Sequence, residues 1–176
     1  MATTSAPRPN PIIYALPAHS SINISCEANA AWLQRITVTI PSDPKSPYQF
    51  TGVGEPGDMR LASGADSIEL TPAPNERPAT FFYEFDATGS RGHFQPALRI
   101  VEPYVKTLRW GQFITIASED GGDQDSNDSI VYINASIVGP LGEEEGGVWQ
   151  RGDRDGGGGG IGGEEALPRG AKIWRK

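Results

Sequence analysis

Two stretches near the N-terminal end of the chain alternate apolar and polar residues. Residues 22–28 place an apolar side chain at every even-numbered position, and residues 35–40 repeat the pattern. A period of two is typical of antiparallel strands that bury one face and expose the other. The pattern predicts a strand in each stretch.

Seven further segments carry short apolar runs. They are 12–16, 48–51, 67–70, 80–85, 97–101, 112–117 and 129–138. Clusters of proline, glycine and aspartate at 41–44, 54–57, 72–78 and 89–92 are typical of turns between strands. No segment keeps the 3.6-residue apolar period of a helix. We therefore expect an all-β protein, an antiparallel β-sandwich of about nine short strands.

The composition changes near residue 142. Of the 22 glycines in the 176-residue chain, 11 lie in residues 143–176. A segment with so much glycine and so little apolar surface does not offset the entropy cost of ordering. We expect a lead without fixed structure at 1–11, a folded domain at 12–142, and a disordered Gly-rich tail of mixed charge at 143–176.

Acidic residues outnumber basic ones by 22 to 15, which gives a net charge of −7. This balance argues against nucleic acid as a partner, because its phosphates require clustered Lys and Arg. No apolar run approaches the roughly 20 residues of a membrane-spanning helix, so we expect no membrane insertion. Residues 1–11 contain no apolar signal segment. We therefore expect a protein that is cytoplasmic or exported without a signal peptide.

The candidate chemistry lies in residues 118–128, which have the sequence SEDGGDQDSND and join the predicted strands 112–117 and 129–138. Five carboxylates, and neither Lys nor Arg, occur in this segment. Such a loop would repel itself without counter-ions. A calcium ion takes roughly six to eight oxygen ligands of this kind, so the segment predicts a calcium site.

The EF-hand, a calcium loop between two helices, does not fit this segment. Asp123, Asp125 and Asn127 match its first three ligand positions. However, Asp128 and Asn134 stand where the EF-hand requires glycine and glutamate, and predicted strands flank the loop.

Two other interpretations do without calcium. A general acid at Glu119 or Asp120 with an aspartate partner is the arrangement of a glycoside hydrolase, but a general acid needs a raised pKa in a drier site than a dense acidic cluster offers. A solvated acidic loop is the second interpretation, although the regular spacing of the carboxylates argues against it.

The segment 118–128, followed by an apolar strand that ends in Ile133-Asn134, resembles the signature of the bacterial calcium-mediated fucose/mannose-binding lectins (LecB type). A second stretch agrees. Leu16-Pro17-Ala18 and the alternating strand that leads to Asn29 are similar to the first two strands of that family and to the calcium-binding asparagine after them.

The resemblance implies a β-sandwich with two adjacent calcium ions and no enzymatic activity. By position, the implied metal ligands are Asn29, Glu119, Asp123, Asp125, Asn127 and Asp128. Glu119 and Asp123 would belong to the outer ion, and Asn29 and Asn127 to the second, whereas Asp125 and Asp128 would bridge both. Five carboxylates against two divalent ions leave about one negative charge.

In the family, sugar hydroxyls complete both coordination shells, and three residues after the asparagine contact the sugar. Here these residues are Ala30, Ala31 and Trp32. Asp120 would accept a hydrogen bond from a sugar hydroxyl. Ala30 offers no hydrogen bond to fucose and resembles the mannose-preferring members. Trp32 would stack on a sugar face or a neighbouring residue, or belong to the core as a strand-end tryptophan.

We therefore expect a calcium-dependent lectin for mannose- or fucose-containing glycans. The alternative is a calcium-stabilised β-sandwich for adhesion or structure, without monosaccharide binding. Family members typically end in Pro-Leu-Gly, whose carboxylate enters the calcium site of a partner chain, and residues 139–142 are similar to that ending. This chain continues for 34 residues. A homodimer therefore depends on a substitute from residues 143–145 or on cleavage after Gly142.

Overall fold

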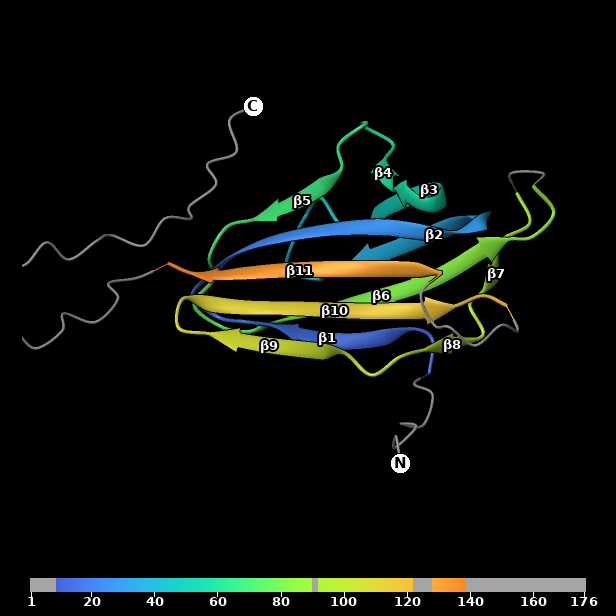
Figure 1. The fold of residues 1–176 in the computed structure, drawn as a ribbon. Coiled ribbons are helices and arrows are strands. Elements are labelled where there is room, and N and C mark those ends of the chain that lie inside the picture. The colour runs from blue at the N-terminus through green and yellow to red at the C-terminus, as the bar shows by residue number, and fades with distance from the viewer. Residues whose placement is uncertain (1–8, 90–91, 122–127, 139–176) are drawn as a thin grey trace, which may run out of the picture. The chain divides into compact units, whose positions relative to one another are not determined.

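The computed structural model describes residues 9–89, 92–121 and 128–138. This part of the chain forms eleven β-strands and no helix (Figure 1). The strands are β1 Ile12–Leu16, β2 Ser20–Thr39, β3 Tyr48–Asp58, β4 Arg60–Leu61, β5 Ser67–Leu70, β6 Arg77–Asp86, β7 Gln95–Pro96, β8 Arg99–Ile100, β9 Tyr104–Leu108, β10 Gly111–Glu119 and β11 Ser129–Ile137. The prediction of an all-β, antiparallel protein is confirmed.

All pairings of the sheet are antiparallel, and its longest path runs β1-β6-β2-β11-β10-β8. The 20-residue strand β2 is the longest strand and pairs with β3, β5, β6 and β11. Its first half, 20–28, pairs with β11 on one side and β5 on the other. Its second half, 33–39, pairs with β6 and β3. The two halves of β2 therefore have different partner strands, and β2 connects β5 and β11 with β3 and β6.

The sequence pattern predicts two strands where the structure has β2. The even-numbered side chains stay buried through both halves, and only the position of Trp32 interrupts them. The register of β2 against β3 shifts between Ala28 and Ala30 and again between Ala30 and Gln34. The two predicted strands are thus one strand with an irregular centre at 29–33, and bulges of this kind are common beside functional sites.

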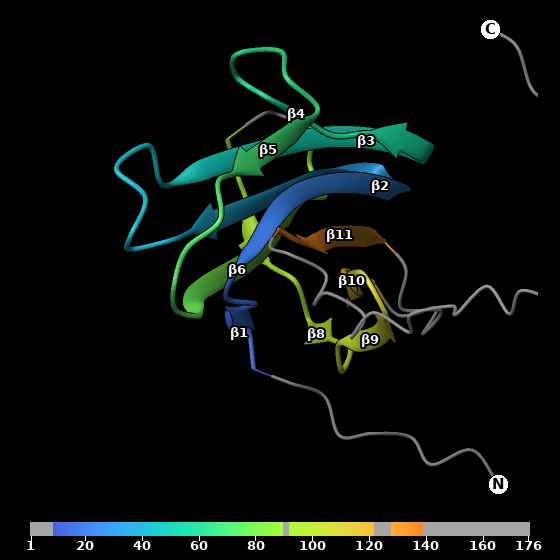
Figure 2. The same ribbon diagram turned by 90° about the vertical axis from the view of Figure 1, so that its left-hand side faces the viewer.

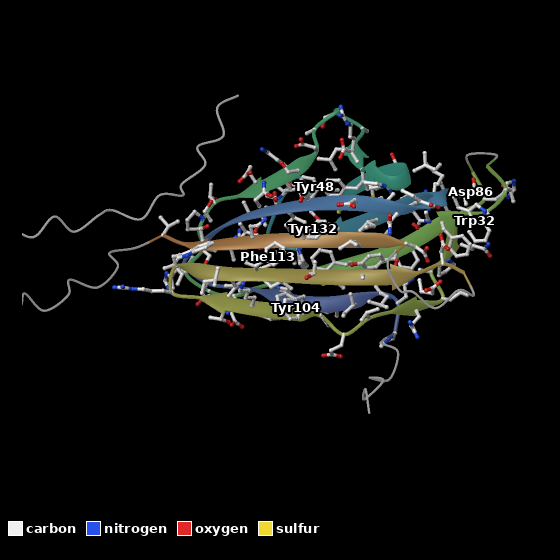
Figure 3. All side chains as sticks on the ribbon, in the orientation of Figure 1. Trp32, Tyr48, Asp86, Tyr104, Phe113 and Tyr132 are labelled. Carbon is white, nitrogen blue, oxygen red and sulfur yellow. The ribbon has the colours of Figure 1, made fainter. Side chains whose placement is uncertain are left out.

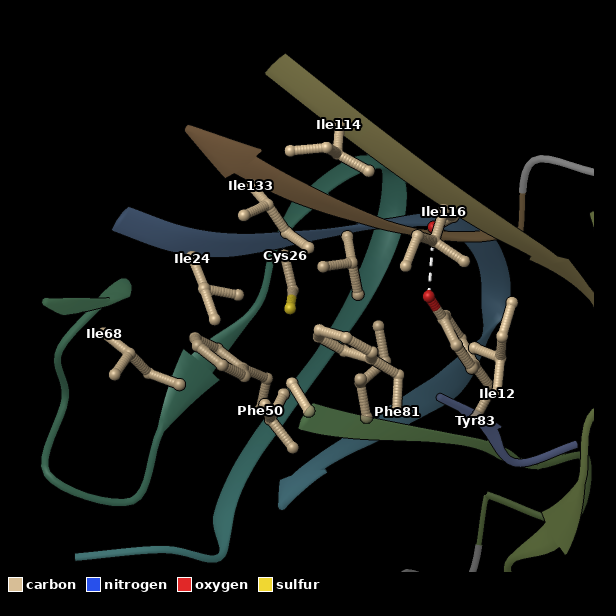
Figure 4. Packing of buried hydrophobic residues seen from close by; sticks show 14 of the residues in the cluster. Ile12, Ile24, Cys26, Phe50, Ile68, Phe81, Tyr83, Ile114, Ile116 and Ile133 are labelled. Carbon is tan, nitrogen blue, oxygen red and sulfur yellow. Dashed lines mark hydrogen bonds between the residues drawn. The ribbon is translucent and has the colours of Figure 1, made fainter. Parts of the chain in front are cut away.

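The sheet folds over into two layers with the core between them (Figure 2). In the strand order, β2 and β11 separate β6 from β10. Nevertheless, the buried Tyr83 hydroxyl of β6 donates a 3.1 Å hydrogen bond to the Ile116 carbonyl of β10 (Figure 4). Because Tyr83 spans the core and satisfies its hydroxyl on the opposite layer, it ties the two layers of the sandwich together.

Most predicted strands occur, with changed bounds. The segments 12–16 and 67–70 coincide with β1 and β5, and 97–101 shrinks to the two residues of β8. The predicted turn at 54–57 lies inside β3, where Gly54 has a φ of 131°. The short strands β4 and β7 and the edge strand β9 were not expected.

The predicted lead and tail stay predictions, because residues 1–8 and 139–176 lie outside the described residues. Within the part of the chain that the structure describes, no helix has the length and apolar character needed to cross a membrane.

Candidate functional site

The acidic segment begins where the β10–β11 ladder ends. Ser118 and Ser129 form the last pair of that ladder, and their buried hydroxyls hydrogen-bond at 2.7 Å. The Asp128 backbone N–H donates to the Ser118 carbonyl at 3.0 Å. Glu119 and Asp120 leave β10 on one side of this closure and Asp128 enters β11 on the other. Two ends of one loop are therefore held face to face by the sheet.

The irregular centre of β2 lies against the same point. Ala28 pairs with Ser129, and the next residue, Asn29, donates its backbone N–H to the Asp128 carbonyl at 2.7 Å. The sheet thus brings Asn29 to a loop that lies about a hundred residues later in the chain. This is the proximity that the family resemblance implies for the two segments.

Three carboxylates converge at this end of the sheet. Glu119, Asp120 and Asp128 each offer an oxygen, and these oxygens all lie within 4.8 Å of one another. All three residues are buried, with exposed fractions of 3%, 6% and 6%. Backbone N–H groups orient two of them: Asp120 donates to Asp128 Oδ2 at 2.6 Å, and Gly121 donates to Glu119 Oε1 at 3.1 Å.

Burial raises the pKa of Asp128 to about 6, and the charge of Asp120 adds to the rise. The backbone N–H of Asp120 opposes the shift because it favours the ionised carboxylate. Like charges held together in a dry site store repulsion that a bound cation relieves. The electrostatics of the cluster therefore favour a cation between these carboxylates.

The donor set fits calcium better than softer metals. The clustered ligands are hard carboxylate oxygens, which suit calcium or magnesium, whereas zinc sites use mostly histidine and cysteine. Glu119 and Asp128, the two predicted metal ligands of this cluster, supply up to four oxygens of the roughly six to eight that one calcium ion takes. The remaining predicted ligands, Asp123, Asp125 and Asn127, lie outside the described residues.

The predicted sugar-contact segment lies in the irregular centre of β2. Ala30 is buried, Ala31 is exposed, and Trp32 is 41% exposed. The indole of Trp32 stacks on the Phe85 ring of β6, with a centroid distance of 5.4 Å and an interplanar angle of 12°. Trp32 is therefore half-buried on a neighbouring residue and keeps an exposed part at the site's end of the sandwich (Figure 3).

Gln34 belongs to this site although the sequence pattern did not predict it. This residue is 1% exposed, and its side-chain Nε2 donates a hydrogen bond to Asp120 Oδ2. A signal was present: Gln34 occupies an even-numbered position on a face that is otherwise apolar before and after it. A polar side chain on the inward face of a strand needs a buried partner, and that partner is the acidic loop.

The end of β6 and the residues that follow it lie next to the irregular centre of β2. Leu33 of β2 pairs with Asp86 at the end of β6. The buried Asp86 carboxylate accepts hydrogen bonds from the Thr88 hydroxyl at 2.6 Å, the Thr88 N–H at 2.9 Å and the Gly92 N–H at 3.2 Å. These bonds, with the Thr88 hydroxyl as the largest cause, lower the pKa of Asp86 to about 2. An ionised Asp86 therefore anchors this loop beside Trp32 (Figure 3).

A two-layer β-sandwich with an acidic loop against the centre of its longest strand belongs to a known class. The model of the fucose-binding lectin II (PA-IIL) family matches residues 14–139. This match defines the protein as a carbohydrate-binding lectin. The chain belongs to the PA-IIL lectin family, as the resemblance of its acidic loop indicated.

Solved structures similar to this chain include a high-affinity mannose-binding lectin of Ralstonia solanacearum, with 28% identity and a TM-score of 0.47 over 69% of this chain and 93% of that one. The C-terminal domain of the BC2L-C lectin of Burkholderia cenocepacia has 25% identity and a TM-score of 0.47 over 73% and 97%. The Chromobacterium violaceum lectin CV2L, in complex with α-methyl-fucoside, has 20% identity and a TM-score of 0.45 over 69% and 93%. No curated relative matches the chain.

Proposed function

We propose that this lectin binds mannose- or fucose-containing glycans only when calcium occupies the acidic loop, through two adjacent ions, and that it has no enzymatic activity. Beyond the family match, the single observation that supports the proposal is the convergence of Glu119, Asp120 and Asp128 beside the irregular centre of β2. This supports the proposal because Asn29, which precedes the predicted sugar-contact segment 30–32, donates its backbone N–H to the Asp128 carbonyl.

The residues divide into two sets with different tasks. The set that would hold calcium is Asn29, Glu119, Asp123, Asp125, Asn127 and Asp128. Bound calcium would supply open coordination positions for sugar hydroxyl oxygens. Asp120 would accept a hydrogen bond from one of these hydroxyls, and the segment 30–32 would contact the rest of the sugar. No covalent bond changes in this scheme.

Mannose is the proposed preferred ligand because Ala30 has no hydrogen-bonding side chain. In the family that this chain belongs to, a serine at this position is associated with fucose preference. Ala30 is buried and its methyl group offers no hydrogen bond, so the choice of ligand would depend on the hydroxyl geometry at the calcium ions.

Thermal unfolding in four buffers tests the proposal: EDTA, calcium, calcium with methyl mannoside, and calcium with methyl galactoside. A ligand that binds only the folded state adds about 2.7 kcal/mol of stability at a hundredfold excess over its dissociation constant. We expect stabilisation by calcium and a further rise with mannoside but not with galactoside. Incubation with a chromogenic mannoside should release no product.

Two variants make the test specific. Asp128→Asn removes one buried carboxylate at nearly constant shape and should abolish both increments. Asp66→Asn is the matched control, because Asp66 is exposed and precedes β5, which pairs with residues 22–25 of β2, and it should respond as the wild type does. Stabilisation by calcium alone would favour a structural module, whereas no response to calcium would refute the proposal. Product release would instead indicate a hydrolase.

A further inference from the structure

Gln34 is a buried polar residue at the junction of three strands. It lies on β2, pairs with Gly52 of β3 and with Phe85 of β6, and is 1% exposed. Its apolar neighbours on the same face of β2, Ile36 and Val38, are fully buried in the core. The sandwich therefore tolerates an amide where a hydrophobic side chain would pack more simply, and the amide must find partners inside.

Both partners of the Gln34 amide belong to the proposed sugar site. Its Nε2 donates to Asp120 Oδ2, across 86 residues of chain, and lies 3.4 Å from the Trp32 carbonyl oxygen. The first bond joins a neutral donor to a carboxylate and is of the stronger, charge-assisted kind. One side chain thus links the acidic loop to the segment that follows Asn29.

We propose that Gln34 is a positioning residue for sugar binding: it fixes the carboxylate of Asp120 as a hydrogen-bond acceptor and ties it to the backbone at Trp32. This inference rests on the proposed function. A carboxylate has about four lone-pair sites, so Asp120 can accept the Gln34 amide and a sugar hydroxyl together. The neutral amide holds Asp120 and leaves its negative charge in place. A Lys or Arg partner would neutralise that charge.

The geometry predicts which property depends on Gln34. Without the donor, the Asp120 backbone N–H still donates to Asp128 Oδ2, but the Asp120 carboxylate loses its link to β2, so the carboxylate samples other orientations before a sugar arrives. Sugar binding must then also order the Asp120 carboxylate, and this free-energy cost weakens the affinity for the sugar. Calcium binding depends on the other carboxylates of the loop, and we expect it to change little.

The experiment compares Gln34→Met and Gln34→Glu with wild type by calorimetric titration of calcium, and then of methyl mannoside at saturating calcium. Methionine keeps the length of the side chain without the donor, and glutamate keeps its shape but turns an acceptor toward Asp120. A lost hydrogen bond to a charged group predicts about tenfold weaker mannoside binding in both variants. Gln34→Met adds no charge to the cluster, so its calcium affinity should stay within about twofold of wild type. Gln49→Met, an exposed site on β3, is the matched control and should behave as wild type.

A double-mutant cycle separates positioning from general structure. Asp120→Ala removes the group through which Gln34 acts, so Gln34→Met should cause no further loss of mannoside affinity in that background. Additive losses, unchanged mannoside affinity in both Gln34 variants, or a loss that weaker calcium binding explains fully would overturn the inference. A wild-type protein that binds no mannoside or fucoside with calcium would instead refute the proposed function, and with it any ligand role of Gln34.

Discussion

At the scale of single residues, Trp32 has one covered and one exposed surface. Phe85 covers one side of its indole, and 41% of the residue stays exposed. The carbonyl of Trp32 shares the Gln34 amide with Asp120, so the indole starts close to the carboxylate that we assign to the sugar. An exposed aromatic surface beside a sugar site can pack on the apolar C–H face of a ring.

Trp32→Ala should weaken mannoside binding by up to about tenfold, because aromatic packing contributes about 0.5–1.5 kcal/mol. Calcium affinity should stay unchanged. Titration calorimetry measures both. Trp110→Ala is the control, because Trp110 is 57% exposed and precedes β10 at the end opposite the acidic loop. Equal mannoside affinity in the two variants would limit Trp32 to packing on Phe85.

Asp86 makes the stability of the metal-free protein depend on acid pH. Its folded pKa of about 2 lies below the ordinary value of 3.8, so the folded state favours the ionised form. This contribution is complete above the unfolded pKa, near 4, and is lost as the pH falls toward 2.

Asp86→Asn should therefore destabilise the metal-free protein fully at pH 6, clearly less at pH 2.5, and hardly at all below pH 2. Urea unfolding in EDTA at several pH values gives the free-energy difference from wild type at each pH. Asp66→Asn, an exposed site before β5, corrects for the loss of one acidic group. A difference between Asp86→Asn and wild type that did not shrink in acid would show that the ionised form is not the one the loop selects.

At the scale of elements, the sequence predicts those strands that bury one face. β1 and β5 are found with their bounds, and β10 and β11 with small shifts, because apolar alternation marks them. β9 has no such alternation: four of its five residues are exposed, and β10 is the only strand that pairs with it among the described residues. Edge strands of this kind depend on a neighbour that the local pattern does not reveal.

The candidate site divides in the same way. Glu119, Asp120 and Asp128 are near in sequence and converge in the structure, so a local motif predicts them. The placement of Asn29 came from a family resemblance rather than from a pattern in its own strand. Gln34 was missed because its role depends on a partner 86 residues away. The local sequence pattern does not reveal which distant residues become neighbours in the fold.

Gly111 sets how closely β10 and β11 approach. It pairs with Ser136 of β11 and with Leu108 of β9, and a β-carbon added to it would collide with the Ala135 carbonyl oxygen. Gly111→Ala should cost about 1–3 kcal/mol of unfolding free energy by overpacking, measured by urea unfolding. Gly92→Ala, where an added β-carbon meets nothing within 4 Å, should leave that value nearly unchanged. Equal stabilities of the two variants would contradict a tight β10–β11 contact.

At the scale of the whole molecule, Cys26 reports on the integrity of the core. The residue is 6% exposed, and it lies among Ile24, Ile133 and Phe50 (Figure 4). Burial raises the pKa of its thiol well above the ordinary value, so the reactive thiolate is absent from the folded protein at neutral pH. Labelling of Cys26 therefore requires the sandwich to open.

Calcium should slow this labelling, because it stabilises the folded state alone. At a hundredfold excess over the dissociation constant the slowing should be about a hundredfold when opening equilibrates faster than labelling. Reaction with a chromogenic disulfide reagent, with and without EDTA, measures the rate. The Asp128→Asn variant should show no such slowing. Rapid labelling of the calcium-loaded wild type would mean that the core opens locally without releasing the ions.

The placement of β2 has a consequence for biosynthesis. Its first half needs β11 as a partner, and β11 follows about a hundred residues later. A chain that emerges N-terminus first can pair β2 with β3, β5 and β6 early, but the edge beside Asn29 stays open until residues 129–137 leave the ribosome. Such an open edge is a template for wrong pairing. The proposed calcium and sugar site can therefore form only after β11 has paired with the first half of β2.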